Sequence, residues 1–321
     1  MSECLDMKII PLIYKYLFFL PLLCTGCHTL KVSMSQPQPL PLVESPDSPV
    51  KVALVLGGGG AKGLAHLGVL YELEQAGIYP DLIVGCSVGA IIGALYADQP
   101  QIERLESLLL GLKRSDLMDF SFFNSKFGLV KGESLQNFLQ NQLQAKTFKE
   151  LKIPLVVVAT DLNTGELIEM GGAEVIPAVV ASSAVPGVFK PVHYLGRYLV
   201  DGGVANPVPV DVAKKFHPQV IIAVDVGQDL STSEPLHLLG IAKRSMEICY
   251  RKLSKHVARS ADVVIEMNFQ DVGIFTDKHN QKIYDHGRQK AREMLPIIAR
   301  VMGERLSSSV ELASPTWRMI E

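Results

Sequence analysis

The sequence predicts an α/β fold in which a parallel sheet is covered by helices on both faces. Short continuous runs of Val, Ile and Leu alternate with segments of helical periodicity, and turn residues separate them. A strand that is buried on both faces has no polar side, so it appears in the sequence as a continuous apolar run. The chain has 321 residues, 48% of them hydrophobic, which is enough for one sizeable core with appendages.

The expected strands are the short apolar runs at 52–56, 81–85, 155–160 and 220–226. Helices are expected where apolar residues recur at spacings of three and four. They are 64–77 with Gly77 as the C-cap, 90–97, 134–143, a segment around 236–260 and a segment around 281–305. The order of these elements, strand then helix, is typical of a parallel sheet.

The first 27 residues have the pattern of an export signal. Two lysines precede the apolar run 16–23, which is too short to span a membrane. The stretch LCTGC resembles a bacterial lipoprotein signal, although Cys24 stands where Leu is usual and Met7 is an alternative start. This resemblance implies that Cys27 is lipidated and anchors the protein in the bacterial envelope, facing the periplasm. A secreted protein is the alternative.

The chain is therefore divided by composition into a signal, a tether and a folded body. Residues 28–49 are rich in Pro and Ser without periodicity, which predicts a solvated, semi-extended tether. The remaining divisions are a catalytic core at 50–213, a strand and helices that complete the domain at 214–305, and a tail at 306–321.

Charge and cysteine content argue against several classes of function. The formal net charge of −2 gives no basic footprint for nucleic acid. Three of the five cysteines lie within the first 27 residues, which leaves no disulfide framework in the body. No cysteine pair in the body has the spacing of metal ligands, so a zinc site is not expected.

A glycine-rich loop, GGGGAKG at 57–63, joins the first strand to the first helix. Such a loop leaves backbone N–H groups exposed at a helix N-terminus, where negative charge is favoured. The loop matches the dinucleotide pattern G-x-G-x-x-G, but the second strand ends in Gly85-Cys86-Ser87 where that pattern needs an acidic residue. A P-loop matches less well, because Gly63, not Ser or Thr, follows Lys62. The other uses are an oxyanion hole and a simple tight connection.

Residues 85–89, GCSVG, form a G-x-S-x-G pattern between a strand and a helix, the context of a nucleophile elbow. Gly85 and Gly89 permit a sharp turn that exposes the hydroxyl of Ser87. A serine needs a base within hydrogen-bond reach. Asp201, before two glycines at a strand end, is one candidate, although Asp-Gly is also a common turn. Among the histidines, His193 is the hardest to exclude.

Together these residues resemble the patatin-like phospholipases. The resemblance is carried by four ordered motifs and covers residues 51–213, with a weaker match at 284–291. The motifs are GGGGAKGLAHLGVL (57–70), GCSVGA (85–90), ASSAVPGVFKPV (181–192) and DGG (201–203).

The resemblance implies a three-layer α/β/α sandwich with a mainly parallel sheet and a Ser-Asp dyad without histidine. Ser87 would be the nucleophile and Asp201 the general base. The amides of the three glycines at positions 58, 59 and 60 (Gly58, Gly59 and Gly60) would form the oxyanion hole, and Lys62 matches the basic position of that loop. The implied reaction is hydrolysis of fatty-acyl esters of phospholipids through an acyl-enzyme, with no cofactor.

Two alternatives to a phospholipase remain at this stage: a lysophospholipase or general carboxylesterase using the same dyad, and a non-catalytic binding or adaptor protein. Two segments suggest contact with a membrane surface. The stretch 115–130 contains four phenylalanines, and the helix around 243–259 is rich in Lys and Arg. Core packing and a solvated helix face are the ordinary explanations of these two segments.

Overall fold

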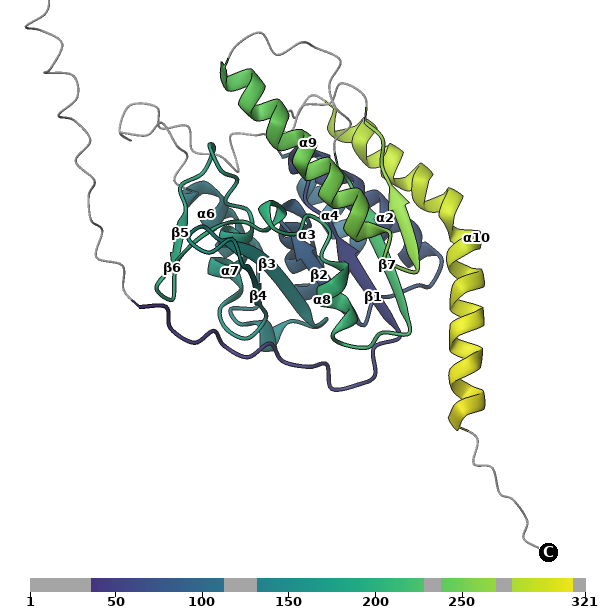
Figure 1. Cartoon of the computed structure of the whole chain (residues 1–321). Helices are drawn as coiled ribbons and strands as arrows, with labels where there is room; N and C mark the ends of the chain where they lie inside the picture. The colour runs from purple at the N-terminus through teal and green to yellow at the C-terminus, as the bar shows by residue number, and fades with distance from the viewer. Residues whose placement is uncertain (1–35, 113–131, 228–237, 270–278, 314–321) are drawn as a thin grey trace, which may run out of the picture. The chain divides into compact units, whose positions relative to one another are not determined.

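The computed structural model describes residues 36–112, 132–227, 238–269 and 279–313. Within these residues the strands form one eight-stranded sheet in the order β5-β6-β3-β2-β1-β7-β8, and β4 also pairs with β3 (Figure 1). The strands are β1 (Val52–Leu56), β2 (Leu82–Cys86), β3 (Leu155–Asp161), β4 (Leu167–Met170), β5 (Val192–Tyr194), β6 (Arg197–Asp201), β7 (Val220–Asp225) and β8 (Val263–Glu266).

Helices cover both faces of the sheet. They are α2 (Leu64–Gln75), α3 (Val88–Asp98), α4 (Ile102–Leu109), α6 (Glu133–Gln142), α7 (Val175–Ser182), α8 (Val210–Lys214), α9 (Leu238–Ala258) and α10 (Asn280–Ala313). Alternate residues of β1 belong to two different cores. Leu54 and Leu56 pack with α2, α3 and α10, whereas Ala53 and Val55 pack with α8 and the end of α9. This three-layer α/β/α arrangement confirms the predicted fold.

The sheet is parallel through β8, β7, β1, β2 and β3, and antiparallel beyond β3. The four predicted strands are present, with their ends shifted by one residue at most. The hairpin of β5 and β6 was not predicted as a pair. Its turn places Leu195 and Gly196 at φ values of 47° and 77°, the backbone of a tight hairpin, and a two-residue connection of this kind forces antiparallel pairing.

Residues 36–49 contain no helix or strand and are mostly exposed, as expected of a solvated segment, but several of them also contact the body. The Gln38 amide donates to the carbonyl of Leu195 (3.0 Å), and the Arg197 guanidinium donates to the carbonyl of Gln38 (2.5 Å). Further along, the carbonyl of Leu42 approaches Gly172 so closely that a Cβ there would lie 1.9 Å from it. Composition alone does not reveal these backbone contacts with the body. Residues 28–35 lie outside the described part of the chain.

The last helix extends further than predicted, because residues 306–313 of the expected tail continue α10. This helix crosses α2 at two glycines. A Cβ on Gly68 would lie 2.3 Å from the carbonyl of Tyr284, and one on Gly287 would lie 2.2 Å from the carbonyl of Ala65. The two backbones are therefore in contact, which fixes α2 and the glycine loop that precedes it.

Candidate active site

Ser87 occupies a strained turn between β2 and α3. Its φ of 55° and ψ of −124° lie where residues with a side chain are rarely found. The flanking glycines are required by space: a Cβ on Gly89 would lie 2.1 Å from the carbonyl of Leu56, and one on Gly85 would lie 2.6 Å from Cα of Ala90. The G-x-S-x-G pattern therefore forms the elbow that its context predicts.

Sheet register brings Asp201 to Ser87. Cys86 pairs with Val158, so the next residue, Ser87, reaches the level of Ala159, and Ala159 pairs with Asp201 on the other side of β3. The Ser87 hydroxyl donates to Oδ2 of Asp201 at 2.5 Å. The second carboxylate oxygen, Oδ1, accepts from the amide of Gly203 at 2.7 Å. The nucleophile and the base that the sequence resemblance implies are thus in direct contact.

The third motif supports both members of this pair. The Ser87 amide donates to Oγ of Ser182 (2.9 Å), and the hydroxyl of Ser183 donates to the carbonyl of Ser87 (3.3 Å). The amide of Asp201 donates to the carbonyl of Ala184 (2.9 Å). Sequence reasoning included these residues in a motif without assigning them a task. The sequence feature that could have revealed this role is the pair of consecutive small polar residues, Ser182 and Ser183, which fit against a crowded turn.

Burial gives the carboxyl group of Asp201 a raised pKa. Ser87 and Asp201 are 6% and 5% exposed. Desolvation raises the pKa of Asp201 from 3.8 to about 6, against the opposing effects of the hydrogen bonds from Ser87 and Gly203. A base in this range is ionised at neutral pH and has a higher proton affinity than an exposed carboxylate, which suits it to accept a proton from a hydroxyl group.

The hydrogen bonds of the glycine loop show which of its amides are available as oxyanion donors. The amide of Gly58 donates to the carbonyl of Pro207 at 3.0 Å, so it is not available to a ligand as a free donor. Of the three predicted donors, the amides of Gly59 and Gly60 have no acceptor among the described residues, so these two remain candidates. Gly60 has a φ of 61°, which explains the need for glycine at that position.

His66 holds the start of this loop. It lies on α2, is fully buried, and its Nε2 is 2.8 Å from the carbonyl of Gly57. Burial lowers the pKa of His66 to about 4, so the ring is neutral at physiological pH and Nε2 carries the donated proton. Sequence reasoning placed His66 in a helix but did not find this task, because the contact depends on the curvature of the loop.

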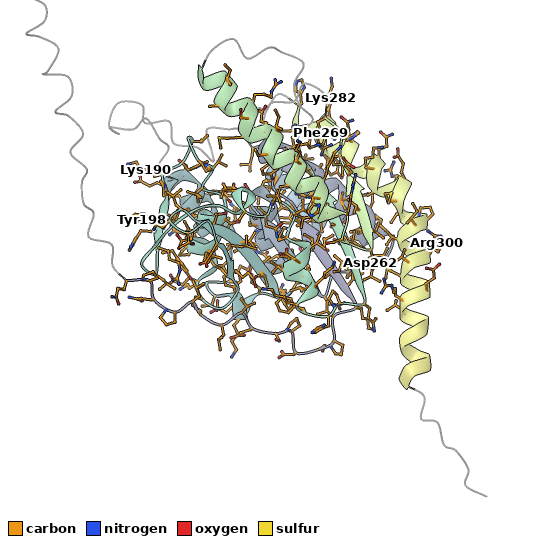
Figure 2. All side chains as sticks on the ribbon, viewed as in Figure 1. Lys190, Tyr198, Asp262, Phe269, Lys282 and Arg300 are labelled. Atoms are coloured by element: carbon orange, nitrogen blue, oxygen red, sulfur yellow. The ribbon has the colours of Figure 1, made fainter. Side chains whose placement is uncertain are left out.

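Lys62, predicted as the supporting basic residue, is also fully buried. Its ammonium group lies 5.8 Å from the centre of the Phe269 ring, an arrangement typical of a cation–π contact. Figure 2 shows Phe269 and Asp262 at opposite ends of β8, so Phe269 marks the edge of the sheet to which the parallel strands point. Lys62 is therefore part of the same edge as the glycine loop.

No histidine acts on the dyad within the described residues. The hydrogen bonds of the Ser87 hydroxyl and of the Asp201 carboxylate are made to each other and to Gly203. His193 is exposed on β5, where its ring packs against Tyr198 with 5.3 Å between the ring centres. The arrangement favours Asp201 over His193 as the base.

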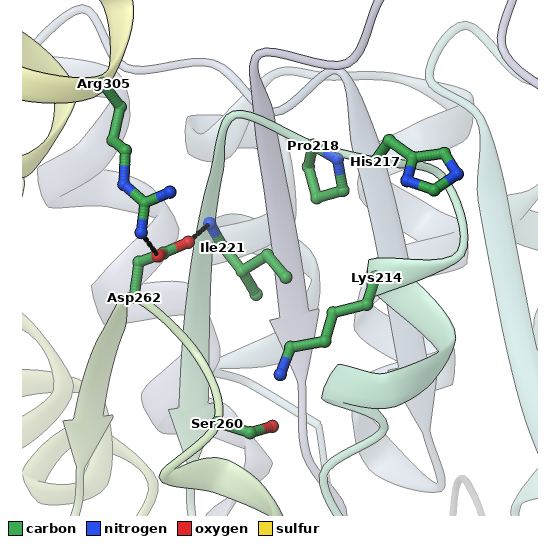
Figure 3. Close-up of a pocket in the computed structure, with 7 residues that line it drawn as sticks. All are labelled: Lys214, His217, Pro218, Ile221, Ser260, Asp262 and Arg305. Atoms are coloured by element: carbon green, nitrogen blue, oxygen red, sulfur yellow. Dashed lines mark hydrogen bonds and ion pairs between the residues drawn. The ribbon is translucent and has the colours of Figure 1, made fainter.

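A separate pocket of about 480 Å³ lies at the opposite edge of the sheet (Figure 3). It adjoins Ile221, the second residue of β7, and Asp262, which directly precedes β8. Ser87 and the glycine loop follow the carboxyl ends of their strands, whereas this pocket lies at the amino ends of β7 and β8. The pocket is therefore separate from the Ser87–Asp201 pair. In the described part of the chain, no three His, Cys, Asp or Glu side chains are grouped so that they could hold a metal ion.

Of the three expectations about membranes, two fall outside the described residues. Cys27 and the four phenylalanines at 115–130 lie in segments that the structure does not describe. On the basic helix, Arg251 faces inward, 3.7 Å from Asp225 and 2.8 Å from Glu266, so it is not available to lipid headgroups. Within the described residues, no helix has both the length and the apolar character needed to cross a membrane.

The comparison with protein families agrees with the geometry of the site. The model of the patatin-like phospholipase family matches residues 54–214, which is half of the chain and includes both Ser87 and Asp201. The chain belongs to the patatin-like phospholipase family. The four motifs described above therefore correspond to the family's own domain, and the matched region ends after α8.

Two related proteins and one solved structure show how far the similarity extends. Patatin-like phospholipase domain-containing protein 6 of Mus musculus is 33% identical over 193 residues, which is 56% of this chain and 14% of that protein. An NTE family protein of Mycobacterium tuberculosis is 32% identical over 190 residues, 59% of this chain and 53% of that protein. The chain thus spans about a seventh of the length of the first and half of the second. The crystal structure of VipD from Legionella pneumophila shares the fold, with a TM-score of 0.52 and 17% identity over 86% of this chain and 72% of that chain.

Proposed function

We propose that this patatin-like protein is a serine acyl hydrolase that cleaves fatty-acyl esters of phospholipids. The observation that supports it most is the contact of 2.5 Å between the Ser87 hydroxyl and the Asp201 carboxylate, at a strained elbow beside the glycine loop. Strain and burial at one place cost stability, and both are concentrated at functional sites. The family supports phospholipid as the substrate class.

The proposed reaction proceeds in two steps. Oγ of Ser87 attacks the ester carbonyl carbon while its proton passes to Asp201, and the carbonyl electron pair moves to the oxygen. The amides of Gly59 and Gly60 stabilise this oxyanion. The carbonyl then re-forms, and the departing alcohol takes the proton from Asp201. Water repeats the sequence on the acyl-enzyme, which releases the fatty acid and restores Ser87.

The test is hydrolysis of phosphatidylcholine vesicles, lysophosphatidylcholine and a soluble short-chain ester by the wild type, Ser87→Ala and Asp201→Asn. Both variants should lose about 10⁴-fold or more in kcat/KM, because each removes one half of the proton-transfer pair. Matched controls come from the other edge of the sheet: Ser260→Ala and Asp262→Asn should keep wild-type rates.

The three substrates separate the alternatives. Hydrolysis of the vesicles supports a phospholipase, whereas turnover of lysophosphatidylcholine or of the soluble ester alone assigns the narrower activities. A folded wild type that turns over none of them and is not labelled by a fluorophosphonate would contradict the proposal and favour a binding protein.

The proposed location is the bacterial envelope, with the body anchored through Cys27. Metabolic labelling with an alkyne fatty acid tests this idea. Label should be incorporated by the wild type and not by Cys27→Ala, with Cys24→Ala as the matched control. If the wild type were exported but not labelled, the secreted form would be favoured.

A further inference from the structure

Helix α9 brings a tyrosine, Tyr250, close to Ser87. A Cβ added to Gly58 would lie 2.5 Å from the hydroxyl oxygen of Tyr250 and 3.2 Å from Cβ of Ser87. Because both distances start from one point, the phenol oxygen and Cβ of Ser87 are no farther apart than the sum of 2.5 and 3.2 Å. The Tyr250 ring also lies against Gly203, where a Cβ would be 2.5 Å from Cε2. Tyr250 therefore touches the loops on both sides of the dyad.

The hydroxyl of Tyr250 has no hydrogen-bond partner among the described residues, although its oxygen is buried. The rest of the ring is partly exposed. A buried polar group without a partner is costly, and in native proteins such groups are few and call for an explanation. Burial, followed by the nearby Cys86 and Asp201, raises the pKa of Tyr250 well above its ordinary value. The phenol thus keeps its proton and remains a donor.

The position of Tyr250 is fixed by its neighbour on α9. Arg251 is 9% exposed and forms ion pairs with Asp225, the last residue of β7, at 3.7 Å and with Glu266, the last residue of β8, at 2.8 Å. These two contacts attach α9 to the edge of the sheet where the glycine loop lies (Figure 1). The hydroxyl is therefore held in place, as a donor to a reacting atom must be.

We propose that the Tyr250 hydroxyl is a third oxyanion donor, which hydrogen-bonds to the carbonyl oxygen of the acyl substrate beside the amides of Gly59 and Gly60. It takes the place of the Gly58 amide, which is engaged by Pro207. As Ser87 forms its bond to the carbonyl carbon and Asp201 takes the proton, the negative charge arises on the carbonyl oxygen. Tyr250 keeps its proton throughout and only donates a hydrogen bond to that oxygen. This inference rests on the proposed acyl hydrolase.

The experiment compares Tyr250→Phe with the wild type on the soluble ester. The Phe ring keeps the contact with Gly203 and loses only the hydroxyl, which is the group that lies beside Gly58. We expect kcat to fall by about 100-fold with KM changed less than twofold, because the donor acts on charge that develops in the transition state. Thermal stability should be unchanged or higher, since no protein hydrogen bond is removed.

Tyr96→Phe is the matched control, because Tyr96 is 1% exposed and its hydroxyl donates to Glu74 at 3.0 Å, away from the dyad. This variant should lower the melting temperature and leave kcat unchanged. A second measurement does not depend on the folded fraction. Ser87 adds to the carbonyl carbon of a trifluoromethyl ketone, and the tetrahedral adduct carries an oxyanion. The matching methyl ketone is bound largely unreacted. Their affinity ratio should fall by about the same 100-fold in Tyr250→Phe.

An unchanged kcat in Tyr250→Phe, a rise in KM alone, or an unchanged ratio of the two ketones would overturn the inference and leave Tyr250 as a packing residue. These outcomes all require an active wild type. They are therefore distinct from failure of the proposed function, in which the wild type itself would neither hydrolyse esters nor react with a fluorophosphonate.

Discussion

The two edges of the sheet use polar residues in opposite ways. At the edge to which the parallel strands point, Ser87, Asp201 and His66 are buried, and the pKa values of the Asp201 carboxyl group and the His66 imidazole are shifted. At the other edge, Lys214 and His217 are exposed, and Asp262 accepts hydrogen bonds from the Ile221 amide and from Arg305 (Figure 3). The Asp201 carboxylate at the first edge lowers stability at neutral pH, whereas the polar groups at the second edge satisfy their neighbours.

The difference teaches where chemistry can be expected in this fold. Both edges carry charged residues, so charge alone does not distinguish them. What distinguishes the first edge is the combination of backbone strain at Ser87, a buried carboxylate at Asp201 and a buried hydroxyl at Tyr250 that has no partner among the described residues. Each of these is unfavourable for folding alone, and together they are the expected cost of a preorganised site.

The largest effect on stability is expected at the elbow. Gly89→Ala places a methyl group 2.1 Å from the carbonyl of Leu56, so β1 and α3 must move apart. We expect a loss of at least about 3 kcal/mol in the free energy of unfolding, together with loss of turnover. Urea denaturation and ester hydrolysis measure the two effects. Gly303→Ala is the matched control at an exposed position of α10, where a Cβ meets nothing within 4 Å, and it should stabilise by about 0.5–1 kcal/mol. If Gly89→Ala were as stable as the wild type, the space around Gly89 would be larger than the structure indicates.

The next effect is a gain in stability when the base is removed. The unfolded chain loses the Asp201 proton near pH 3.8 and the folded protein near pH 6, so this group lowers the stability of the wild type as pH rises through that window. Asp201→Asn has no such dependence. At pH 7.5 it should be more stable than the wild type by about 2–3 kcal/mol, and at pH 3.5 the two should be equal. Denaturant unfolding at several pH values measures the difference. A variant that is less stable than the wild type at pH 7.5 would contradict the cost assigned to this edge.

A smaller loss is expected at His66, which supports the loop without touching the dyad. His66→Leu removes the hydrogen bond to Gly57 and should destabilise the protein by about 1–2 kcal/mol at pH 7.5. The pKa of His66 is lower in the folded protein, so the wild type loses stability as pH falls from 6.5 toward 4, and the variant lacks this loss. The gap between the two proteins should therefore shrink in acid. A gap that widens in acid would mean that His66 is protonated in the folded protein.

The sequence predicted the parallel part of the molecule better than the antiparallel part, for a physical reason. The elbow at Ser87 and the glycine loop are local, because each is determined by glycines within a few residues of it. Asp201 reaches Ser87 through the pairing of β6 with β3, which no local pattern reveals. Its role therefore came from the resemblance to a family, and the residues alone left His193 open as a second candidate.

The same distinction explains what was missed. The tasks of Ser182, Ser183, His66 and Tyr250 depend on contacts with residues far away in the chain or across a curved loop. The engagement of the Gly58 amide by Pro207 is of this kind as well. The binding of residues 36–49 to the body is made largely by backbone groups, and composition carries little information about those.

The central claim is that Asp201 alone acts as the base for Ser87, and the pH dependence of kcat/KM for a soluble ester tests it most directly. Between pH 4.5 and 8.5, the wild type should show a tenfold rise per pH unit below a single inflection near 6, and a plateau above it. Asp201→Asn should be inactive throughout, and His193→Ala should reproduce the wild-type curve. An inflection that His193→Ala abolishes, or substantial activity in Asp201→Asn, would contradict the account.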